Sequence, residues 1–302
     1  MDRVIFGDNQ FFGVNHASEM KAREQAIRFQ RNDAIIDVLD FAYRQGIRTF
    51  MCTTHDRVRD ICEYIRANLE TYPDFQFYPC MPYAHKYADA VTEHGILGAL
   101  KGFLPDQGSI GALLRGGKAF ATKDIEVMGR MLIDAEMKMF AGLRTPVVFL
   151  QNVVTDLLLG LQANDSFRIF SDHVRERYDA EPGFITMNVP KLLEALDDVG
   201  IRDPIICANF NKAGFRMCGG VDSYEQIARD RPIRFIAMSV FASGALSARD
   251  ALQYVCGFPR IRSVVFGAST PHHIAQSKQL IDEMWESNHS MTEAAESGQL
   301  SS

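Results

Sequence analysis

The feature that most limits how this chain can fold is a regular alternation of short apolar runs with amphipathic stretches. The runs are three to seven residues long and mostly apolar, which suits strands buried on both faces of a parallel sheet. The stretches between them have helical periodicity, as in Asp33–Arg44, where Ile35, Ile36 and Leu39 share one helix face. The predicted strands are Val4–Phe6, Ile47–Cys52, Phe75–Met81, Val147–Leu150, Phe184–Thr186, Ile205–Ala208, Ile233–Met238 and Ser263–Phe266.

Helical patterns separate these runs along the chain. Repeated strand–helix units in a chain of 302 residues favour a closed (β/α)8 TIM barrel of the α/β class. An open dinucleotide-binding sheet needs a G-x-G-x-x-G turn after its first strand, and Phe6–Gly13 has its glycines at other positions. The predicted helices are Asp33–Arg44, Arg57–Leu69, Ala88–Phe103, Asp124–Phe140, Phe167–Tyr178, Pro190–Val199, Ser223–Arg229, Ala248–Cys256 and Pro271–Trp285.

No linker-like tract divides the chain before its end. We therefore predict a single barrel over residues 1–288, with an inserted glycine-rich loop at about 102–122 and a flexible polar tail at 289–302. The net charge of −6 and the lack of a Lys/Arg cluster argue against a nucleic-acid surface. No signal peptide and no apolar run of about 20 residues is visible, and the cysteines are scattered, so we expect a cytoplasmic protein acting on a small molecule.

The turn Gly267–Pro271 follows the last predicted strand. Ser269 or Thr270 can cap the helix that begins there, and Pro271 suits its first turn. Free backbone N–H groups at a helix start attract anions, and in a barrel this turn lies on the face where phosphate is held. The turn therefore predicts a phosphate-bearing ligand.

Four segments in order along the chain resemble the aldo-keto reductases: Tyr43–Phe50, Gly183–Asn188, Ala237–Gly244 and Val265–Ser277. The resemblance extends over nearly the whole chain and implies a barrel enzyme that binds NADP(H) and acts on a small polar carbonyl or sugar-like metabolite. The residues that it implies for the cofactor are Asn188, Ser239, Ser243, Gly244, Gly267, Ser269, Thr270 and Gln276.

The reductases of this family use a tetrad of Asp, Tyr, Lys and His, and this chain departs from that pattern. Carbonyl reduction needs an acid that protonates the developing alkoxide, so a chain without the tetrad needs a substitute. We take His55 as that acid. The tetrad positions are filled by Met51 or Cys52 for Asp, His55 or Asp56 for Tyr, a late Lys86 for Lys, and Gln151 or Asn152 for His.

Catalytic groups of a barrel lie in the loops that follow its strands, and this rule selects the remaining candidates. Imidazole titrates near neutral pH, so histidines next to a charged residue suit acid–base chemistry. Amides and ammonium groups suit a polar substrate. The predicted catalytic residues are His55, Asp56, Tyr83, His85 and Lys86, and the predicted substrate-binding residues are Asp8, Asn9, His16, Gln151, Asn152, Asn209 and Lys212.

Three other hypotheses stay open. Cys52, His55, Cys80 and His85 offer the thiolate and imidazole ligands of tetrahedral zinc, although their spacing matches no known zinc motif and strand side chains alternate in direction. The barrel could also serve a non-redox lyase, isomerase or hydrolase with a His/Lys or Cys/His site, or a catalytically silent binding protein. Titration with NADPH separates the oxidoreductase from these alternatives.

Overall fold

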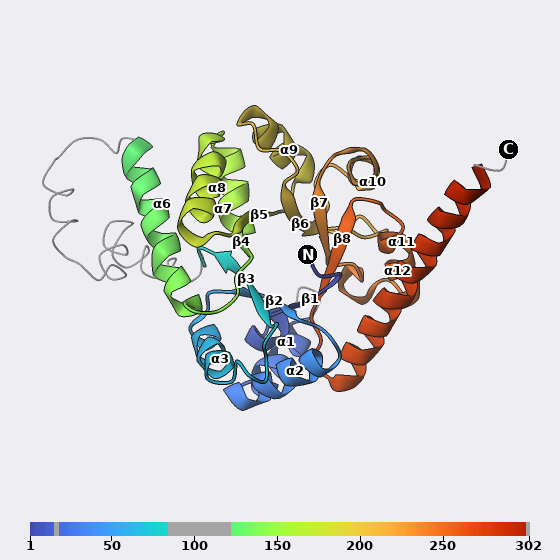
Figure 1. The fold of residues 1–302 in the computed structure, drawn as a ribbon, viewed down its shortest axis with the longest axis horizontal. Coiled ribbons are helices and arrows are strands. Elements are labelled where there is room, and N and C mark those ends of the chain that lie inside the picture. Colours follow the sequence, from blue (N-terminus) through green and yellow to red (C-terminus); the bar gives the residue numbers. More distant parts are fainter. Residues whose placement is uncertain (15–17, 84–121, 300–302) are drawn as a thin grey trace, which may run out of the picture.

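The computed structural model describes residues 1–14, 18–83 and 122–299, and these residues form a closed barrel of eight parallel strands. The strands follow one another around the ring in chain order, and β8 pairs with β1 to close it. Helices surround the ring (Figure 1). The fold is therefore the predicted (β/α)8 TIM barrel.

The observed strands lie close to the predicted apolar runs. Two strands, β5 and β8, begin earlier than expected, because their pairing with the preceding strands starts at Glu181 and at Ile261. The strands are β1 Val4–Gly7, β2 Thr49–Thr53, β3 Gln76–Met81, β4 Val147–Leu150, β5 Glu181–Thr186, β6 Ile205–Asn209, β7 Arg234–Met238 and β8 Ile261–Phe266.

Most predicted helices are present within the described residues. They are α2 Asn32–Arg44, α3 Asp56–Ala67, α6 Thr122–Met137, α8 Asp165–Tyr178, α9 Val189–Asp198, α10 Val221–Asp230, α11 Ala248–Cys256 and α12 Pro271–Gln299. Two further helices, α1 Glu19–Arg28 and α7 Asn152–Gly160, were not predicted, and short 3-10 turns occur at η1 Asn9–Phe12, η2 Lys138–Phe140 and η3 Ala242–Gly244.

Three predictions concern the ends and insertions of the barrel. The predicted helix Ala88–Phe103 and nearly all of the inserted loop at 102–122 lie outside the described residues. The last helix, α12, continues through 289–299, where we expected a flexible tail, and extends away from the barrel (Figure 1). In the part of the chain that the structure describes, no helix combines the length and the apolar character needed to cross a membrane.

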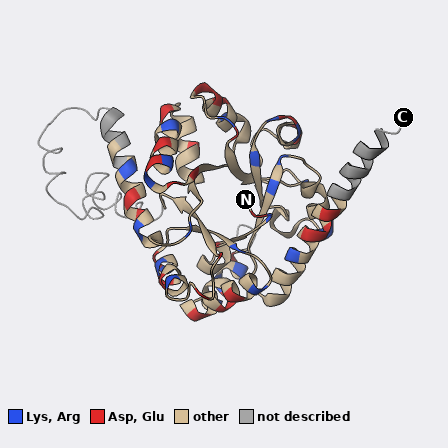
Figure 2. Cartoon of the chain, viewed as in Figure 1, with Lys and Arg blue, Asp and Glu red and all other residues tan. Residues whose placement is uncertain are grey.

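The core has two layers, which follow from the alternation of side chains along each strand. One cluster lies inside the barrel and includes Ile5, Tyr78, Phe149, Cys207 and Ile236. A larger cluster fills the space between the strands and the surrounding helices. Acidic and basic residues are interspersed along those outer helices (Figure 2). Strand side chains therefore divide into a lining of the barrel and a support for the helices.

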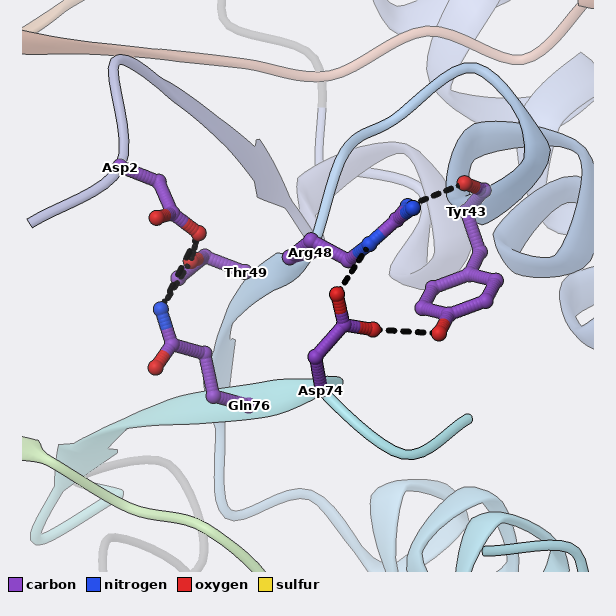
Figure 3. A network of polar contacts seen from close by, with 6 residues as sticks. All are labelled: Asp2, Tyr43, Arg48, Thr49, Asp74 and Gln76. Carbon is purple, nitrogen blue, oxygen red and sulfur yellow. Dashed lines mark hydrogen bonds and ion pairs between the residues drawn. The ribbon is translucent and has the colours of Figure 1, made fainter. Parts of the chain in front are cut away.

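Polar residues close the end of the barrel at which β2 and β3 begin; we call this end the floor. Asp2 Oδ2 accepts hydrogen bonds from Thr49 Oγ1 at 2.5 Å and Gln76 Nε2 at 3.1 Å (Figure 3). Beside this group, Asp74 accepts hydrogen bonds from Arg48 and from the hydroxyl of Tyr43. The carboxylates of the floor are thus each bound by two side-chain donors.

Candidate active site

The candidate site is the opposite end of the barrel, which we call the rim and define as the residues that end or directly follow the eight strands. All strands run parallel, so these residues share one end of the barrel. The rim carries most of the residues that the sequence singled out. Its part at β1–β3 holds ionisable groups, and its part at β7–β8 holds backbone turns.

Asp8 directly follows β1 and is 6% exposed. Its Oδ2 accepts hydrogen bonds from both the backbone N–H and the hydroxyl of Thr53, each at 2.7 Å. Thr53 ends β2, the strand next to β1, so the pairing of these two strands brings the donors to the carboxyl. Burial raises the pKa of Asp8, and the Thr53 bonds offset part of that rise.

The titratable neighbours of Asp8 are uncharged at neutral pH. Burial raises the pKa of Cys52 and Cys80 well above the usual thiol value, and the charge of Asp8 adds to that effect. Burial, followed by the same charge, also raises the pKa of Tyr83. Asp8 therefore lies in an environment that disfavours its own negative charge.

His55 caps helix α3 with its ring. Its Nδ1 accepts a hydrogen bond from the backbone N–H of Arg57 at 3.1 Å, and the ring stacks on Phe12 with centroids 4.3 Å apart. The Tyr83 ring lies edge-on to it at 5.9 Å. Because Nδ1 is an acceptor here, the ring proton belongs on Nε2 in the neutral form. His55 is thus a fixed hydrogen-bond donor through Nε2.

Glu136 is a buried acid that joins two parts of the rim. It lies on α6, is 3% exposed, and accepts a hydrogen bond from Thr54 Oγ1 at 2.5 Å. The backbone N–H of Tyr83 donates to both of its carboxylate oxygens at 3.1 and 3.2 Å. These contacts tie the residues after β2 to those after β3. They position Tyr83 near Asp8 and His55.

Two of the predicted amide residues, Asn188 and Asn209, bind residues of the rim loops. Gln151 is buried at the start of α7, and Asn188 Oδ1 caps α9 by accepting from the N–H of Lys191. Asn209 Nδ2 donates to the carbonyl of Arg216 and to the sulfur of Met187, both at 2.9 Å. These bonds fix the loops after β5 and β6. They leave the amides at the rim in defined orientations.

The turns after β7 and β8 form the part of the rim predicted for the cofactor. Ser239 and Ser243 both have positive φ, as does Gly244, so the loop after β7 turns sharply. After β8, the N–H of His273 donates to Thr270 Oγ1, which confirms the predicted helix cap. The first turn of α12 contains no acidic residue.

Two glutamines approach this turn from the segment between β1 and β2. A Cβ at Gly267 would lie 2.0 Å from Gln10 Oε1, so only glycine leaves room for that side chain. Gln25 Nε2 on α1 donates to Ser269 Oγ at 3.4 Å. Both glutamine Oε1 atoms are buried without a hydrogen-bond partner in the described part of the chain. Two amide oxygens beside the turn therefore lack donors.

The other candidates are more scattered. Asp56 begins α3 and forms an exposed ion pair with Arg59. Asn9, Lys212 and Gln276 are exposed, and Asn152 is the half-buried first residue of α7. His16, His85 and Lys86 lie outside the described residues. Their predicted roles stay predictions.

The zinc hypothesis has only part of its ligand set in the described residues. Cys52 packs in the outer cluster, between the strands and the helices, whereas Cys80 packs in the cluster inside the barrel. Within residues 1–14, 18–83 and 122–299, no group of three or more His, Cys, Asp or Glu side chains is placed to hold a metal ion. The role of His85 in such a site stays a prediction.

Sequence reasoning missed Glu136 and Gln10, and it noted Thr53 only as a residue at the end of its strand. A signal for Glu136 was present: it falls between Ile133 and Phe140, two buried residues, on the apolar face of its helix. A charged residue in an apolar stripe indicates a buried polar contact. Thr53 and Gln10 gave no such signal, because small polar residues and amides are common near strand ends.

Solved structures share this architecture. A putative aldo-keto reductase from Pseudomonas aeruginosa aligns with a TM-score of 0.58 at 14% identity, covering 94% of this chain and 90% of that chain. Aldose reductase from Giardia lamblia aligns with a TM-score of 0.53 at 12% identity, covering 95% of this chain and 92% of that chain. A variant of the protein Gox0644, solved in complex with NADPH, aligns with a TM-score of 0.53 at 10% identity, covering 94% and 89%.

No protein-family model matches the sequence, and no curated protein matches it. The likeness to solved structures establishes the fold at these identities. The resemblance to aldo-keto reductases seen in four sequence segments is therefore confirmed at the level of the fold.

Proposed function

We propose that this protein is an oxidoreductase that binds a nicotinamide dinucleotide, NADP(H), across the β7–β8 part of its rim and reduces small polar carbonyl compounds. The observation that carries the proposal is the turn Gly267–Thr270, which combines a capped helix start with the unpartnered amide oxygens of Gln10 and Gln25. The barrel is the one found in a protein solved with NADPH. We extend this similarity in fold to the ligand and the reaction of the present chain.

The residues at this turn fit both kinds of group that a dinucleotide carries. Backbone N–H groups at the start of α12 can bind phosphate oxygens, and no acidic side chain in that turn opposes them. The oxygens of Gln10 and Gln25 need donors, which ribose hydroxyls or an adenine amine can supply. Ser239, Ser243 and Gly244 would face the cofactor from the loop after β7, and Asn188 and Gln276 would add polar groups at its edges.

The bound cofactor supplies the hydride in this chemistry. The chain itself must orient the carbonyl and manage the proton. His55 presents Nε2–H as a donor that can polarise a carbonyl oxygen, because its Nδ1 is already held by the Arg57 N–H. Glu136 keeps Tyr83 in place beside it, and Asn209 and Gln151 offer amide groups for a polar substrate. We assign His55 to orientation and polarisation of the carbonyl.

A fluorescence titration with NADPH tests this function. The wild-type protein should bind with a dissociation constant below about 1 mM. Gly267→Ala should weaken binding roughly tenfold, because the added methyl displaces Gln10 from the turn. Gly129→Ala is the matched control, since a Cβ at Gly129 meets nothing within 4 Å. Wild-type protein that shows no binding at millimolar NADPH would contradict the proposal.

The second candidate is a non-redox acid–base enzyme on the same barrel. It is favoured by the buried Asp8 at the rim, which such an enzyme could use without a cofactor. Absence of NADPH binding, together with a carbonyl-dependent proton exchange at the substrate's α-carbon, would support this candidate instead.

A further inference from the structure

We propose that Asp8 is the group that holds and delivers the proton at the rim, and that Thr53 is its positioning residue. The inference rests on the proposed function, because a proton is needed where a carbonyl is reduced. It assigns a catalytic role to a residue that the sequence suggested only for substrate binding. The supporting observations are the contacts of the Asp8 carboxyl, its burial and the character of its neighbours.

The contacts of Asp8 distinguish its two carboxyl oxygens. Oδ2 accepts two hydrogen bonds from Thr53, one from the N–H and one from the hydroxyl, both at 2.7 Å. An oxygen with two donors aimed at it is the acceptor side of a protonated carboxyl. When Asp8 is protonated, its proton is therefore on Oδ1. Both donors belong to one residue of the neighbouring strand, so the orientation of the carboxyl is tied to the pairing of β1 with β2.

The groups around Asp8 favour its neutral form. Among the described residues, the titratable groups whose pKa responds to the charge of Asp8 include the thiols of Cys52 on β2 and Cys80 on β3 and the phenol of Tyr83 beyond β3. Each stays uncharged at neutral pH, and no cationic side chain of the described residues contributes to the electrostatics of Asp8. A carboxyl that is buried without a cation keeps its proton to a higher pH than an exposed one.

The other ionisable side chains of this part of the rim are less suited to give up a proton. His55 uses Nδ1 as an acceptor, so its remaining proton on Nε2 belongs to a neutral imidazole, which is a very weak acid. Burial and the charge of Asp8 raise the pKa of Tyr83, which makes the phenol a weaker acid than usual. Asp8 is the strongest acid of the three, and the carboxylate of Glu136, the other buried acid here, accepts hydrogen bonds from Thr54 and from the backbone N–H of Tyr83.

The proposed step transfers one proton. As the carbonyl carbon of the substrate gains the hydride of a bound dihydronicotinamide, the Oδ1–H bond of Asp8 breaks and the proton bonds to the carbonyl oxygen. The electron pair of that bond stays on Asp8, which becomes a carboxylate held by Thr53. The products are the alcohol and the oxidised nicotinamide. Solvent then returns the proton to Asp8.

The test has one readout on the protein alone and one on turnover. With ¹³C-labelled aspartate, the Asp8 carboxyl signal is assigned by its loss in Asp8→Asn and titrated by NMR. We expect its midpoint above the ordinary aspartate value of 3.8. Turnover is followed as NADPH oxidation with 4-nitrobenzaldehyde as the probe. Asp8→Asn should lower kcat by roughly 10²–10⁴-fold, the usual contribution of a general acid, and should remove the fall in rate at high pH.

Asp2→Asn is the matched control, because Asp2 also accepts a hydroxyl bond from a β2 threonine but lies at the floor. Its kcat and pH profile should equal those of the wild type. An Asp8→Asn variant that keeps the wild-type rate and pH profile, or an Asp8 midpoint at or below 3.8, overturns the role of Asp8 alone. A wild-type protein that binds NADPH but oxidises none overturns that role as well. Failure to bind NADPH overturns the proposed function itself.

Discussion

At each end of strand β2, a threonine of that strand donates a hydrogen bond to an aspartate that flanks strand β1. The two aspartates differ in their other partners. At the floor, Thr49 donates to Asp2, which Gln76 also binds. At the rim, Thr53 donates twice to Asp8, which no other side chain in the described residues binds. The floor carboxylate is thus bound by two side chains, whereas the rim carboxyl is bound by the side chain of one residue. This difference agrees with the proposal that the floor maintains the barrel and that the rim carries the chemistry.

The two ends of the barrel also differ in the direction of their carboxyl pKa shifts. Partial burial works against ionisation of Asp74 at the floor, but hydrogen bonds from Tyr43 and Arg48 outweigh it and lower its pKa (Figure 3). Burial raises the pKa of Asp8 at the rim, where only the Thr53 donors and its own backbone N–H oppose it. Folding therefore favours the charged form of one carboxyl and the neutral form of the other.

The largest loss of stability is expected from a substitution inside the barrel, between the floor and the rim. Gly183 on β5 faces Phe149 inside the barrel, and a Cβ there would lie 2.3 Å from a ring carbon. Gly183→Ala should lower the free energy of unfolding by about 3 kcal/mol, because the closed ring leaves Phe149 little room to move. Urea unfolding measures this. A variant as stable as the wild type would show that the interior between the floor and the rim is loosely packed around Phe149.

A floor variant should affect stability alone. Asp2→Ala removes the acceptor for Thr49 and Gln76, and we expect a loss of about 2 kcal/mol of unfolding free energy. The NADPH affinity of the variant should match that of the wild type in the same titration. A clear drop in affinity without a loss of stability would place the floor, rather than the rim, in ligand binding.

A substitution at Thr53 should have a smaller effect, and it tests how the rim positions Asp8. Thr53→Val removes the hydroxyl donor to Asp8 but keeps the backbone N–H donor. The carboxylate form then loses one hydrogen bond, so the pKa of Asp8 should rise further. The high-pH limb of the rate profile should move upward by the same amount. Thr49→Val at the floor is the control. If the high-pH limb of the rate profile moves equally in both variants, Thr53 is not the positioning residue of Asp8.

The fold was predictable because its strands are short apolar runs in a regular order. The structure confirms those runs and most of the helices between them. Helix α1 escaped prediction because none of its residues is buried, and Met20 and Ile27 are exposed, so it has no apolar face to detect. Helix α7 escaped because it has only nine residues and two of its five apolar side chains, Val153 and Leu157, are exposed, so it has no clear apolar face.

The positions of residues at the strand ends were predictable from the sequence, but their contacts were not. The rule that chemistry follows the strand ends selected Asp8, His55 and the turn after β8. It could not show that Nδ1 of His55 is occupied by a helix cap, which changes what that ring can do. Nor could it show that Asp8 meets Thr53, because that contact depends on the register of β1 with β2.

The comparison between rim and floor is tested most directly by the pH dependence of unfolding free energy in Asp8→Asn and Asp74→Asn. Because the pKa of Asp8 is raised, the wild type loses stability as pH rises above 3.8. Asp8→Asn should therefore be more stable than the wild type at pH 7, and that gain should disappear toward pH 4. The lowered pKa of Asp74 contributes stability above 3.8, so Asp74→Asn should be less stable at pH 7, and its deficit should shrink as pH falls below that value. An Asp8→Asn variant that loses stability at pH 7 as Asp74→Asn does would contradict the account.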